Sequence, residues 1–317
     1  MTLIINAATQ HFIVHASDRL LTKRVGSSIR VHSNIENKSL IVRIHDAICI
    51  IGYTGAAYIG DTITDEWIAS TITGLDLSGD FMMRQPGVRG LTLNQLLRRI
   101  EAGLRAVVLP PSTNYLGITV SGVRQRGRYS RPFVREFERN RGVVRSGGHM
   151  RSPRSPNFHV LSQIGDHGPM NELPLTIGKE FAELGISAEA FRRGMINAIR
   201  ERSARTKTVG DEVMTVTVRR PPEGWDVVWR FESPRPHFAA LVREGEPEIP
   251  FRSFFSPWII TPGGISKPSI GNAHLDHLAG GVTIRCGNKE PEAPVNGNGS
   301  RPRMLMGASS QNRARLS

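Results

Sequence analysis

The feature that most constrains this fold is a pair of almost uninterrupted apolar runs between residues 39 and 53. The first contains Leu40-Ile41-Val42 and the second contains Ile48-Cys49-Ile50-Ile51. A strand with one face in water alternates apolar and polar residues, whereas a strand covered on both faces is apolar throughout. We therefore predict two strands, at residues 39–44 and 47–53, in a sheet that lies between two other layers.

The elements predicted on either side of these strands supply such layers. Apolar residues at three- and four-residue steps predict helices that begin near Ile59, Leu91 and Ser187, the last with Ser187 as its N-cap. Two β-rich runs around a short polar break at residues 9–11 predict a hairpin. The further predicted strands lie at residues 2–8, 12–17, 115–123, 129–137, 213–218 and 225–231. This order indicates an α+β fold with helices outside paired sheets.

Changes in composition divide the chain into three predicted parts. A folded domain is expected over residues 1–234, with a loop or insert rich in Arg, Ser, Gly and Pro over residues 140–157. A proline-rich C-terminal extension follows over residues 235–286, and its apolar stretch 254–260 is expected to pack back onto the body. Residues 287–317 have the composition of a disordered tail.

The net charge of +13 is concentrated in one segment. Ten arginines lie between Arg124 and Arg154, against only Glu136 and Glu138, so this segment supplies +8 of the total. It is short of aromatic residues that could stack on bases, and it contains no helix-turn-helix, zinc or RNA-binding signature. We predict a solvated arginine-rich hairpin that could bind an acidic partner, and we do not expect the protein to bind nucleic acid.

Two further properties of the chain point to a cytoplasmic protein. Cys49 and Cys286 are the only cysteines, which does not support a disulfide framework. The sequence has neither a secretory-type start nor an apolar run of the roughly 18 residues that a membrane span needs. We expect a soluble protein in the cytoplasm, without a membrane partner.

Thr2, directly behind Met1, is the first candidate for chemistry. If Met1 is removed, Thr2 carries a hydroxyl and a free α-amine on the same residue. The amine, whose ordinary pKa is about 7.7 to 8.0, can then act as a general base for the hydroxyl. Threonine also has a small side chain, the kind after which Met1 is normally removed.

Four short motifs follow Thr2, namely Asp18-Arg19, Asn37-Lys38, Gly52-Tyr53-Thr54-Gly55 and Gly60-Asp61. Their order and spacing resemble those of proteasome β-type subunits, which are N-terminal nucleophile hydrolases. The resemblance covers about residues 2–231 and depends on the order and spacing of these short motifs. It implies a four-layer αββα sandwich, extended here by an irregular C-terminal segment.

The resemblance also implies a role for each matching residue. Thr2 would be the nucleophile, and Asp18 would hold Lys38, whose charge lowers the proton affinity of the Thr2 amine and hydroxyl. Gly55 would contribute a backbone N–H to the oxyanion hole. In the substrate site, the backbone of Thr22 would pair with an extended peptide, and Tyr53 would lie near the side-chain pocket. No metal or cofactor is implied.

Two parts of the family pattern are not preserved in this sequence. Members carry an Asp-x-x-Ser cluster after the third helix that orients the N-terminal amine. Here Ser203 or Thr208 could supply the hydroxyl and Glu201 or Asp211 the carboxylate, and the sequence does not choose between them. A Ser-Gly pair in the middle of the chain has Ser162-Gln163-Ile164-Gly165 as its nearest counterpart.

Two classes of function follow. As an enzyme, the protein would be a threonine-type peptidase or amidohydrolase that cleaves a peptide or a small amide. The resemblance implies self-association into a ring or stack, and an ATP-dependent unfoldase as a further partner. As a non-enzyme, it would be an inactive assembly or scaffold subunit whose arginine-rich segment binds an acidic partner.

Overall fold

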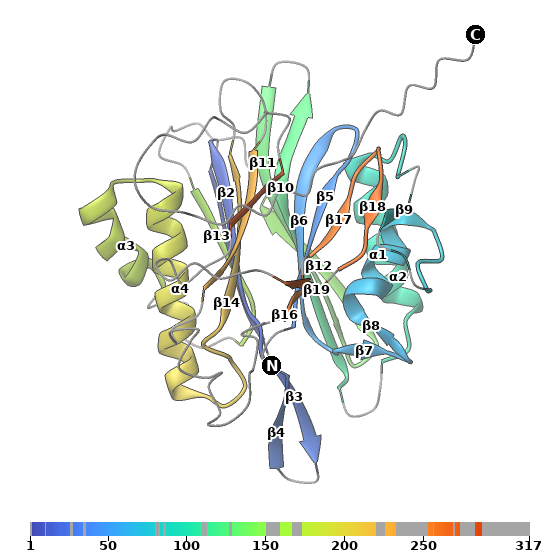
Figure 1. Cartoon of the computed structure of the whole chain (residues 1–317), viewed down its shortest axis with the longest axis horizontal. Coiled ribbons are helices and arrows are strands. Elements are labelled where there is room, and N and C mark those ends of the chain that lie inside the picture. The colour runs from blue at the N-terminus through green and yellow to red at the C-terminus, as the bar shows by residue number, and fades with distance from the viewer. Residues whose placement is uncertain are drawn as a thin grey trace.

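The computed structural model describes residues 2–9, 11–25, 28–33, 36–79, 81, 83–84, 87–109, 113–126, 129–149, 159–166, 173–219, 226–232, 253–255, 257–268, 270–272 and 283–286. In these residues the protein is a mixed α/β structure with two large sheets and four α-helices. Figure 1 shows the two sheets side by side, with α3 and α4 outside one sheet and α1 and α2 outside the other.

The first large sheet has six strands in the order β13-β1-β2-β14-β15-β20, and all of its pairings are antiparallel. The predicted N-terminal hairpin forms β1 and β2, and the predicted strands near residues 213 and 225 form β14 and β15. The strands are β1 (Leu3–Thr9), β2 (Phe12–Asp18), β13 (His159–Gly165), β14 (Val213–Arg219), β15 (Asp226–Glu232) and β20 (Thr283–Cys286).

The second large sheet has eight strands in the order β12-β11-β10-β6-β5-β17-β18-β9. The two apolar runs form β5 (Ser39–Arg43) and β6 (Ala47–Gly55), and all but the last residue of each is buried. This confirms the prediction of strands covered on both faces. The remaining strands are β9 (Met83–Arg84), β10 (Tyr115–Arg126), β11 (Tyr129–Asn140), β12 (Val143–His149), β17 (Trp258–Ile260) and β18 (Ile265–Ser266).

Neighbouring residues on each central strand enter different parts of the core. On β2, Ile13 packs between the sheets whereas Val14 packs beneath α4. On β6, Ile50 packs between the sheets whereas Ile51 packs beneath α1 and α2. This alternation follows from the two-residue period of a strand, and it explains why both faces must be apolar.

A buried polar network interrupts the apolar core between the sheets. His15 is fully buried, with its Nδ1 2.8 Å from Asn6 Oδ1 and its Nε2 2.7 Å from Ser39 Oγ. The Asn6 oxygen also accepts from Ser121 Oγ at 3.0 Å, and the Asn6 amide donates to Thr119 Oγ1 at 3.2 Å. The Asn6 oxygen therefore faces the ring, so Nδ1 carries the proton and Nε2 accepts from Ser39. The network links β1 and β2 to β5 and β10.

Four helices cover the outer faces of the sheets. The two beside the larger sheet are α1 (Thr64–Thr73) and α2 (Leu93–Ala106), which begins with a capping box between Thr92 and Gln95. The two beside the smaller sheet are α3 (Leu173–Leu184) and α4 (Ala188–Arg205). As predicted, Ser187 caps α4 by accepting from the backbone N–H of Ala190 at 3.1 Å.

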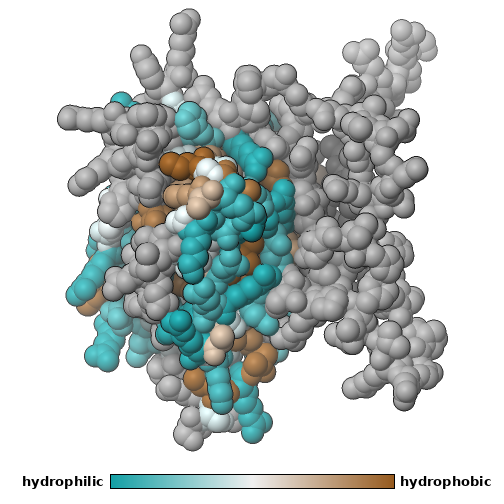
Figure 2. Space-filling view, turned by 90° about the vertical axis from the view of Figure 1, so that its left-hand side faces the viewer, coloured by the Kyte–Doolittle hydropathy of each residue, from teal (hydrophilic) through white to brown (hydrophobic). Residues whose placement is uncertain are grey.

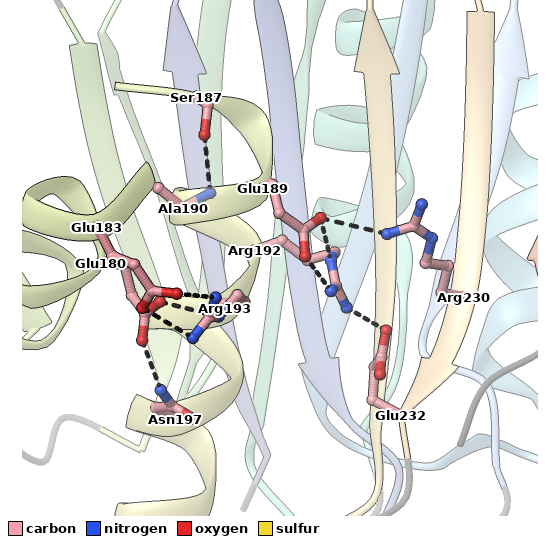
Figure 3. Close-up of polar contacts among 10 residues, drawn as sticks. All are labelled: Glu180, Glu183, Ser187, Glu189, Ala190, Arg192, Arg193, Asn197, Arg230 and Glu232. Atoms are coloured by element: carbon pink, nitrogen blue, oxygen red, sulfur yellow. Dashed lines mark hydrogen bonds and ion pairs between the residues drawn. The ribbon is translucent and has the colours of Figure 1, made fainter. Parts of the chain in front are cut away.

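Ion pairs tie α4 to the elements on either side of it (Figure 3). Arg193 contacts Glu180 and Glu183 of α3, whereas Arg192 contacts Glu189 in its own helix and Glu232 on β15. The described residues on this side of the molecule are mostly hydrophilic (Figure 2). The helix therefore presents its charged side outward and its apolar side to the sheet.

Two sequence predictions need correction, and several elements were not predicted. The first helix begins at Thr64 rather than near Ile59, because Gly60 has a left-handed φ of +60° and turns the chain between the short strands β7 (Tyr58–Ile59) and β8 (Thr62–Ile63). Residues 143–149 form β12 rather than a loop, because they pair with β11. The sequence also gave no prediction of α3, of β13, or of the hairpin formed by β3 (Leu21–Val25) and β4 (Ser28–Ser33).

Part of the predicted C-terminal extension belongs to the larger sheet. Strand β17 pairs in parallel with β5, and Trp258 and Ile260 are buried in the core beneath α1 and α2. Strands β16 (Ser253–Phe255) and β19 (Ile270–Asn272) form a separate pair. Residues 150–157, 235–252 and the predicted tail 287–317 lie outside the described residues. None of the described helices has the length and apolar content of a membrane span.

Candidate functional site

Thr2 and Lys38 meet where the first strand of one sheet begins beside the start of β5 in the other. The Lys38 Nζ donates a hydrogen bond to Thr2 Oγ1 at 2.7 Å. Both residues are buried, with 5% of Thr2 and 1% of Lys38 exposed. The structure therefore brings the threonine hydroxyl and the lysine ammonium into direct contact.

Asp18, at the end of β2, forms the other side of this cluster. Its Oδ2 lies 3.2 Å from Lys38 Nζ, and Lys38 also donates to the Leu20 carbonyl at 2.6 Å. The carboxylate accepts three backbone N–H groups, from Leu3 at 2.8 Å and from Leu20 and Gly210 at 3.1 Å each. Asp18 is thus held from three directions, and its position fixes that of Lys38.

Strand pairing determines which side chains reach the cluster. In the β1–β2 register Ile4 lies opposite Ser17, so Leu3 comes next to Asp18 at the end of the hairpin. Tyr53 N–H donates to the Lys38 carbonyl at 3.1 Å and so fixes the lysine backbone against β6. The sixteen-residue spacing from Thr2 to Asp18 is therefore the length of one hairpin.

Burial dominates the electrostatics of Lys38. Desolvation lowers the pKa of its ammonium, and the opposing effect of the Asp18 charge and hydrogen bond is smaller. An ammonium with a lowered pKa gives up a proton more readily. The Thr2 hydroxyl thus contacts a group that can stabilise negative charge on oxygen and can also exchange a proton with it.

The backbone of Thr2 is held by residues that the sequence pattern did not assign. Its N–H donates to Thr54 Oγ1 at 3.3 Å, and its carbonyl accepts from the Asp166 N–H at 2.9 Å and from the Thr54 hydroxyl at 3.3 Å. Gly165 has a φ of +96°, and a Cβ there would lie 1.9 Å from the Thr2 carbonyl oxygen. Position 165 therefore requires glycine.

Asp166, whose backbone N–H contacts the Thr2 carbonyl, also has a buried side chain. It is 4% exposed, and its Oδ1 accepts from Arg202 Nε at 3.0 Å and Nη2 at 2.7 Å. Of the sequence alternatives, Glu201 is exposed on α4, and the hydroxyl of Thr208 lies 2.9 Å from that of Thr206. The roles of these two residues, and of Ser203 and Asp211, stay predictions. The run from Ser162 to Gly165, predicted as the nearest counterpart of the Ser-Gly pair, lies on β13, and Asp166 follows it directly.

The other predicted site residues lie around the cluster. Gly55 ends β6 with a φ of +102°, and a Cβ there would lie 2.3 Å from the Tyr115 carbonyl oxygen. Thr22 lies on β3, two residues beyond the Leu20 carbonyl that Lys38 contacts. Tyr53 is buried in the core, where its hydroxyl donates to the Asn37 carbonyl at 3.2 Å. Their roles toward a substrate stay predictions.

No group of three or more His, Cys, Asp and Glu side chains with the spacing of a metal site occurs in the part of the chain that the structure describes. Cys49 is buried, and burial raises the pKa of its thiol, so the neutral form prevails. The cluster around Thr2 presents a hydroxyl, an ammonium and a carboxylate group.

Comparison with known proteins gave similarity at the level of structure only. No family model matches the chain, and no curated protein matches it. The structure is similar to that of an Anbu (Gly-1) mutant from Hyphomicrobium sp. strain MC1, with 12% identity, a TM-score of 0.44 and coverage of 69% of this chain and 83% of that chain. It is also similar to Anbu (ancestral beta-subunit) from Yersinia bercovieri, with 11% identity, a TM-score of 0.40 and coverage of 68% and 80%.

Proposed function

We propose that this protein is a threonine-type peptidase or amidohydrolase whose nucleophile is Thr2, freed by removal of Met1. The observation that carries the proposal is the 2.7 Å hydrogen bond from Lys38 Nζ to Thr2 Oγ1, with Asp18 on the other side of the lysine. A cation next to a hydroxyl favours its alkoxide and lowers its proton affinity. The sequence resemblance to proteasome β-type subunits assigns the same three residues.

Formation of the acyl-enzyme needs two proton transfers and two bond changes at one carbonyl carbon. The α-amine of Thr2 accepts the hydroxyl proton while Oγ1 attacks the amide carbonyl, and the proton then passes to the leaving amine. The same amine then deprotonates a water molecule that attacks the resulting ester. The bond between the carbonyl carbon and Oγ1 breaks, and the proton passes from the amine to Oγ1. The Thr2 nitrogen already contacts Thr54 Oγ1 at 3.3 Å, so this hydroxyl is suited to orient the amine.

The other residues of the site have supporting roles in this proposal. Asp18 positions Lys38, and Asp166, tied to Arg202, fixes the Thr2 carbonyl through its backbone N–H. Gly55 is proposed to supply an oxyanion-hole donor, and such a donor contributes about 2.7 to 4 kcal/mol of transition-state stabilisation. The substrate class is a peptide or a small amide.

The proposed function implies a corresponding fold and assembly. We infer a four-layer αββα sandwich over residues 1–234, with residues 235–286 as an extension packed on it. The arrangement of helices outside two sheets in Figure 1 supports this inference. Self-association into a ring or stack would enclose the sites, and an unfoldase would deliver substrate.

A second candidate function is favoured by the burial of Thr2. Only 5% of Thr2 is exposed, and a nucleophile must contact a substrate carbonyl. If Met1 is retained, the Thr2 nitrogen stays in a peptide bond and cannot act as the base. The protein would then be an inactive assembly subunit with the same architecture.

Intact mass and electrophile labelling distinguish the two functions. The hydrolase predicts a chain that begins at Thr2 and is labelled once by an electrophile directed at N-terminal threonine. Thr2→Val keeps the shape of the side chain but removes the hydroxyl, so labelling should cease, whereas Thr2→Ser should retain it. Retention of Met1, or equal labelling of the valine variant, would eliminate Thr2 as the nucleophile.

A further inference from the structure

We propose that His15 is a positioning residue for the Thr2 cluster, because its buried ring fixes the separation of the two large sheets across which Lys38 reaches Thr2. The ring acts through Ser39 and Gly52 of the facing sheet. The consequence for catalysis rests on the proposed function, whereas the consequence for the geometry of the cluster does not.

The contacts that define the Thr2 cluster cross from one large sheet to the other. Thr2 directly precedes β1 and Asp18 ends β2, both in the six-stranded sheet. Lys38 directly precedes β5 and Thr54 lies on β6, both in the eight-stranded sheet. Lys38 Nζ lies 2.7 Å from Thr2 Oγ1 and 3.2 Å from Asp18 Oδ2. Since a hydrogen bond is lost at about 3.6 Å, a small increase in the distance between the sheets would break these contacts.

The ring of His15 fills the space between the sheets next to this cluster. His15 lies on β2, three residues before Asp18, and it is fully buried. A Cβ at Gly52 would lie 2.5 Å from His15 Cε1, so the ring packs directly on the backbone of β6. Only glycine leaves room for the ring at this position. The ring therefore sets how closely β2 approaches β6.

Hydrogen bonds from both sheets hold the ring in this place. Nδ1 donates to Asn6, the direct partner of His15 in the β1–β2 register, at 2.8 Å. Nε2 accepts from Ser39 Oγ at 2.7 Å, and Ser17 Oγ lies 3.3 Å from the same oxygen. All four side chains are fully buried, where a hydrogen bond is stronger than in water. The network therefore specifies one arrangement of the two sheets.

The two residues beneath the ring are direct neighbours of the site residues. Ser39 follows Lys38, and Gly52 lies two residues before Thr54. Ser39 and Gly52 are partners in the β5–β6 register, and the Tyr53 N–H donates to the Lys38 carbonyl at 3.1 Å. Movement of the Ser39–Gly52 pair away from β2 would therefore move Lys38 and Thr54 away from the threonine.

The separation of the sheets also controls the electrostatics of Lys38. Burial lowers the pKa of its ammonium. A wider gap would admit water, which would raise that pKa toward its ordinary value of about 10.4. The ammonium would then give up a proton less readily, and it would also lie farther from the Thr2 hydroxyl.

An NMR titration of Lys38 in the full chain tests the proposal. The chain has six lysines, so in protein with ¹³C-labelled lysine the Lys38 signals are identified by their absence from Lys38→Met. Ser39→Ala removes the hydroxyl that holds Nε2, and Gly52→Ala places a methyl group against the ring. In each variant the Lys38 pKa should rise by about 1 or more, because the two changes disturb the same gap from different sides.

Ser121→Ala is the matched control. The Ser121 hydroxyl belongs to the same buried network, since it donates to the Asn6 oxygen at 3.0 Å. It lies opposite Ile50 on β6, two residues farther from the cluster than Gly52. Ser121→Ala and Ser39→Ala each remove one buried hydroxyl, so their losses of stability in urea should be similar. The Lys38 pKa should nevertheless stay at its wild-type value in Ser121→Ala.

Labelling of Thr2 by an electrophile directed at N-terminal threonine measures the consequence for catalysis. The labelling rate should fall about tenfold or more in Ser39→Ala and in Gly52→Ala, because a misplacement of about 1 Å can cost up to a hundredfold. It should stay at the wild-type rate in Ser121→Ala. A wild type that is not labelled would refute the proposed function, while the titration of Lys38 would still decide the positioning role.

Two results would overturn the positioning role. One is an unchanged Lys38 pKa in both Ser39→Ala and Gly52→Ala, and the other is an equal rise in Ser121→Ala. Circular dichroism shows whether each variant folds. Should Gly52→Ala fail to fold, the comparison of Ser39→Ala with Ser121→Ala gives the answer alone.

Discussion

Acidification from about pH 7 to about pH 5 should destabilise this protein through His15, by an amount that follows from its surroundings. Burial between the sheets lowers the pKa of His15 from 6.5 to about 3. The folded state therefore keeps the imidazole neutral at pH values where the unfolded state protonates it. Stability from this group is fully present above the unfolded pKa and is lost as the pH falls toward the folded pKa.

The size of the effect is set by the difference between the two pKa values. Each pH unit below about 6.5 lowers the free energy of unfolding by about 1.4 kcal/mol. Lowering the pH from about 7 to about 5 should therefore lower it by about 2 kcal/mol. The hydrogen bonds explain why the neutral ring is required. Nε2 accepts from Ser39, and a proton on Nε2 would replace that acceptor with a donor in a buried site.

Urea denaturation of the wild type and of His15→Asn at several pH values measures this contribution. The wild type should lose about 2 kcal/mol more than the variant between about pH 7 and about pH 5, because asparagine does not titrate. If the variant does not fold, the ring signals of His15 in the wild type give the answer by NMR, since they should not titrate in this range. Parallel loss of stability in both proteins, or a His15 ring that becomes protonated, would refute the reasoning.

Two further predictions concern the residues around Thr2. Asp18→Asn and Lys38→Met should each cost about 3 to 5 kcal/mol, because each leaves a buried charge without its partner, and the double variant should cost less than their sum. A double-mutant cycle from urea denaturation measures this coupling, and additive costs would contradict the buried pair. Gly165→Ala should cost at least about 2 kcal/mol, because the new Cβ would overlap the Thr2 carbonyl oxygen at a left-handed φ. Gly60→Ala is the control, because Gly60 also has a left-handed φ but has open space around the new Cβ. In thermal and urea denaturation its loss of stability should stay near about 1 kcal/mol. Similar losses at both positions would show that steric overlap at Gly165 is not the cause.

The parts of the fold that the sequence predicted are those with a strong local signal. The continuous apolar runs at 39–44 and 47–53 identified the two central strands, and Ser187 marked the start of α4 through its capping hydroxyl. By contrast, β12 contains Arg145 and Gly147 and reads as a loop. It is a strand because β11 supplies its hydrogen bonds, which is a nonlocal cause.

The same contrast between local signals and nonlocal pairing applies to the candidate site. Thr2 was a candidate from its position behind Met1, the roles of Asp18 and Lys38 came from the family resemblance, and the structure brings the three residues together. The contacts of Gly165 and Asp166 with Thr2 were not predicted, because their proximity to Thr2 arises from the β1–β13 pairing, in which Leu3 lies opposite Gly165. Such pairings over long separations leave little trace in local sequence.

The parallel pairing of β17 with β5 has a consequence for biosynthesis. Trp258 and Leu40 are partners about 220 residues apart, so the larger sheet cannot be completed until most of the chain has left the ribosome. Until then, the edge of the apolar strand β5 that will pair with β17 has no hydrogen-bonding partner. The nascent protein would be most vulnerable to edge-to-edge aggregation during this interval, and a truncation before residue 258 would make that vulnerability permanent.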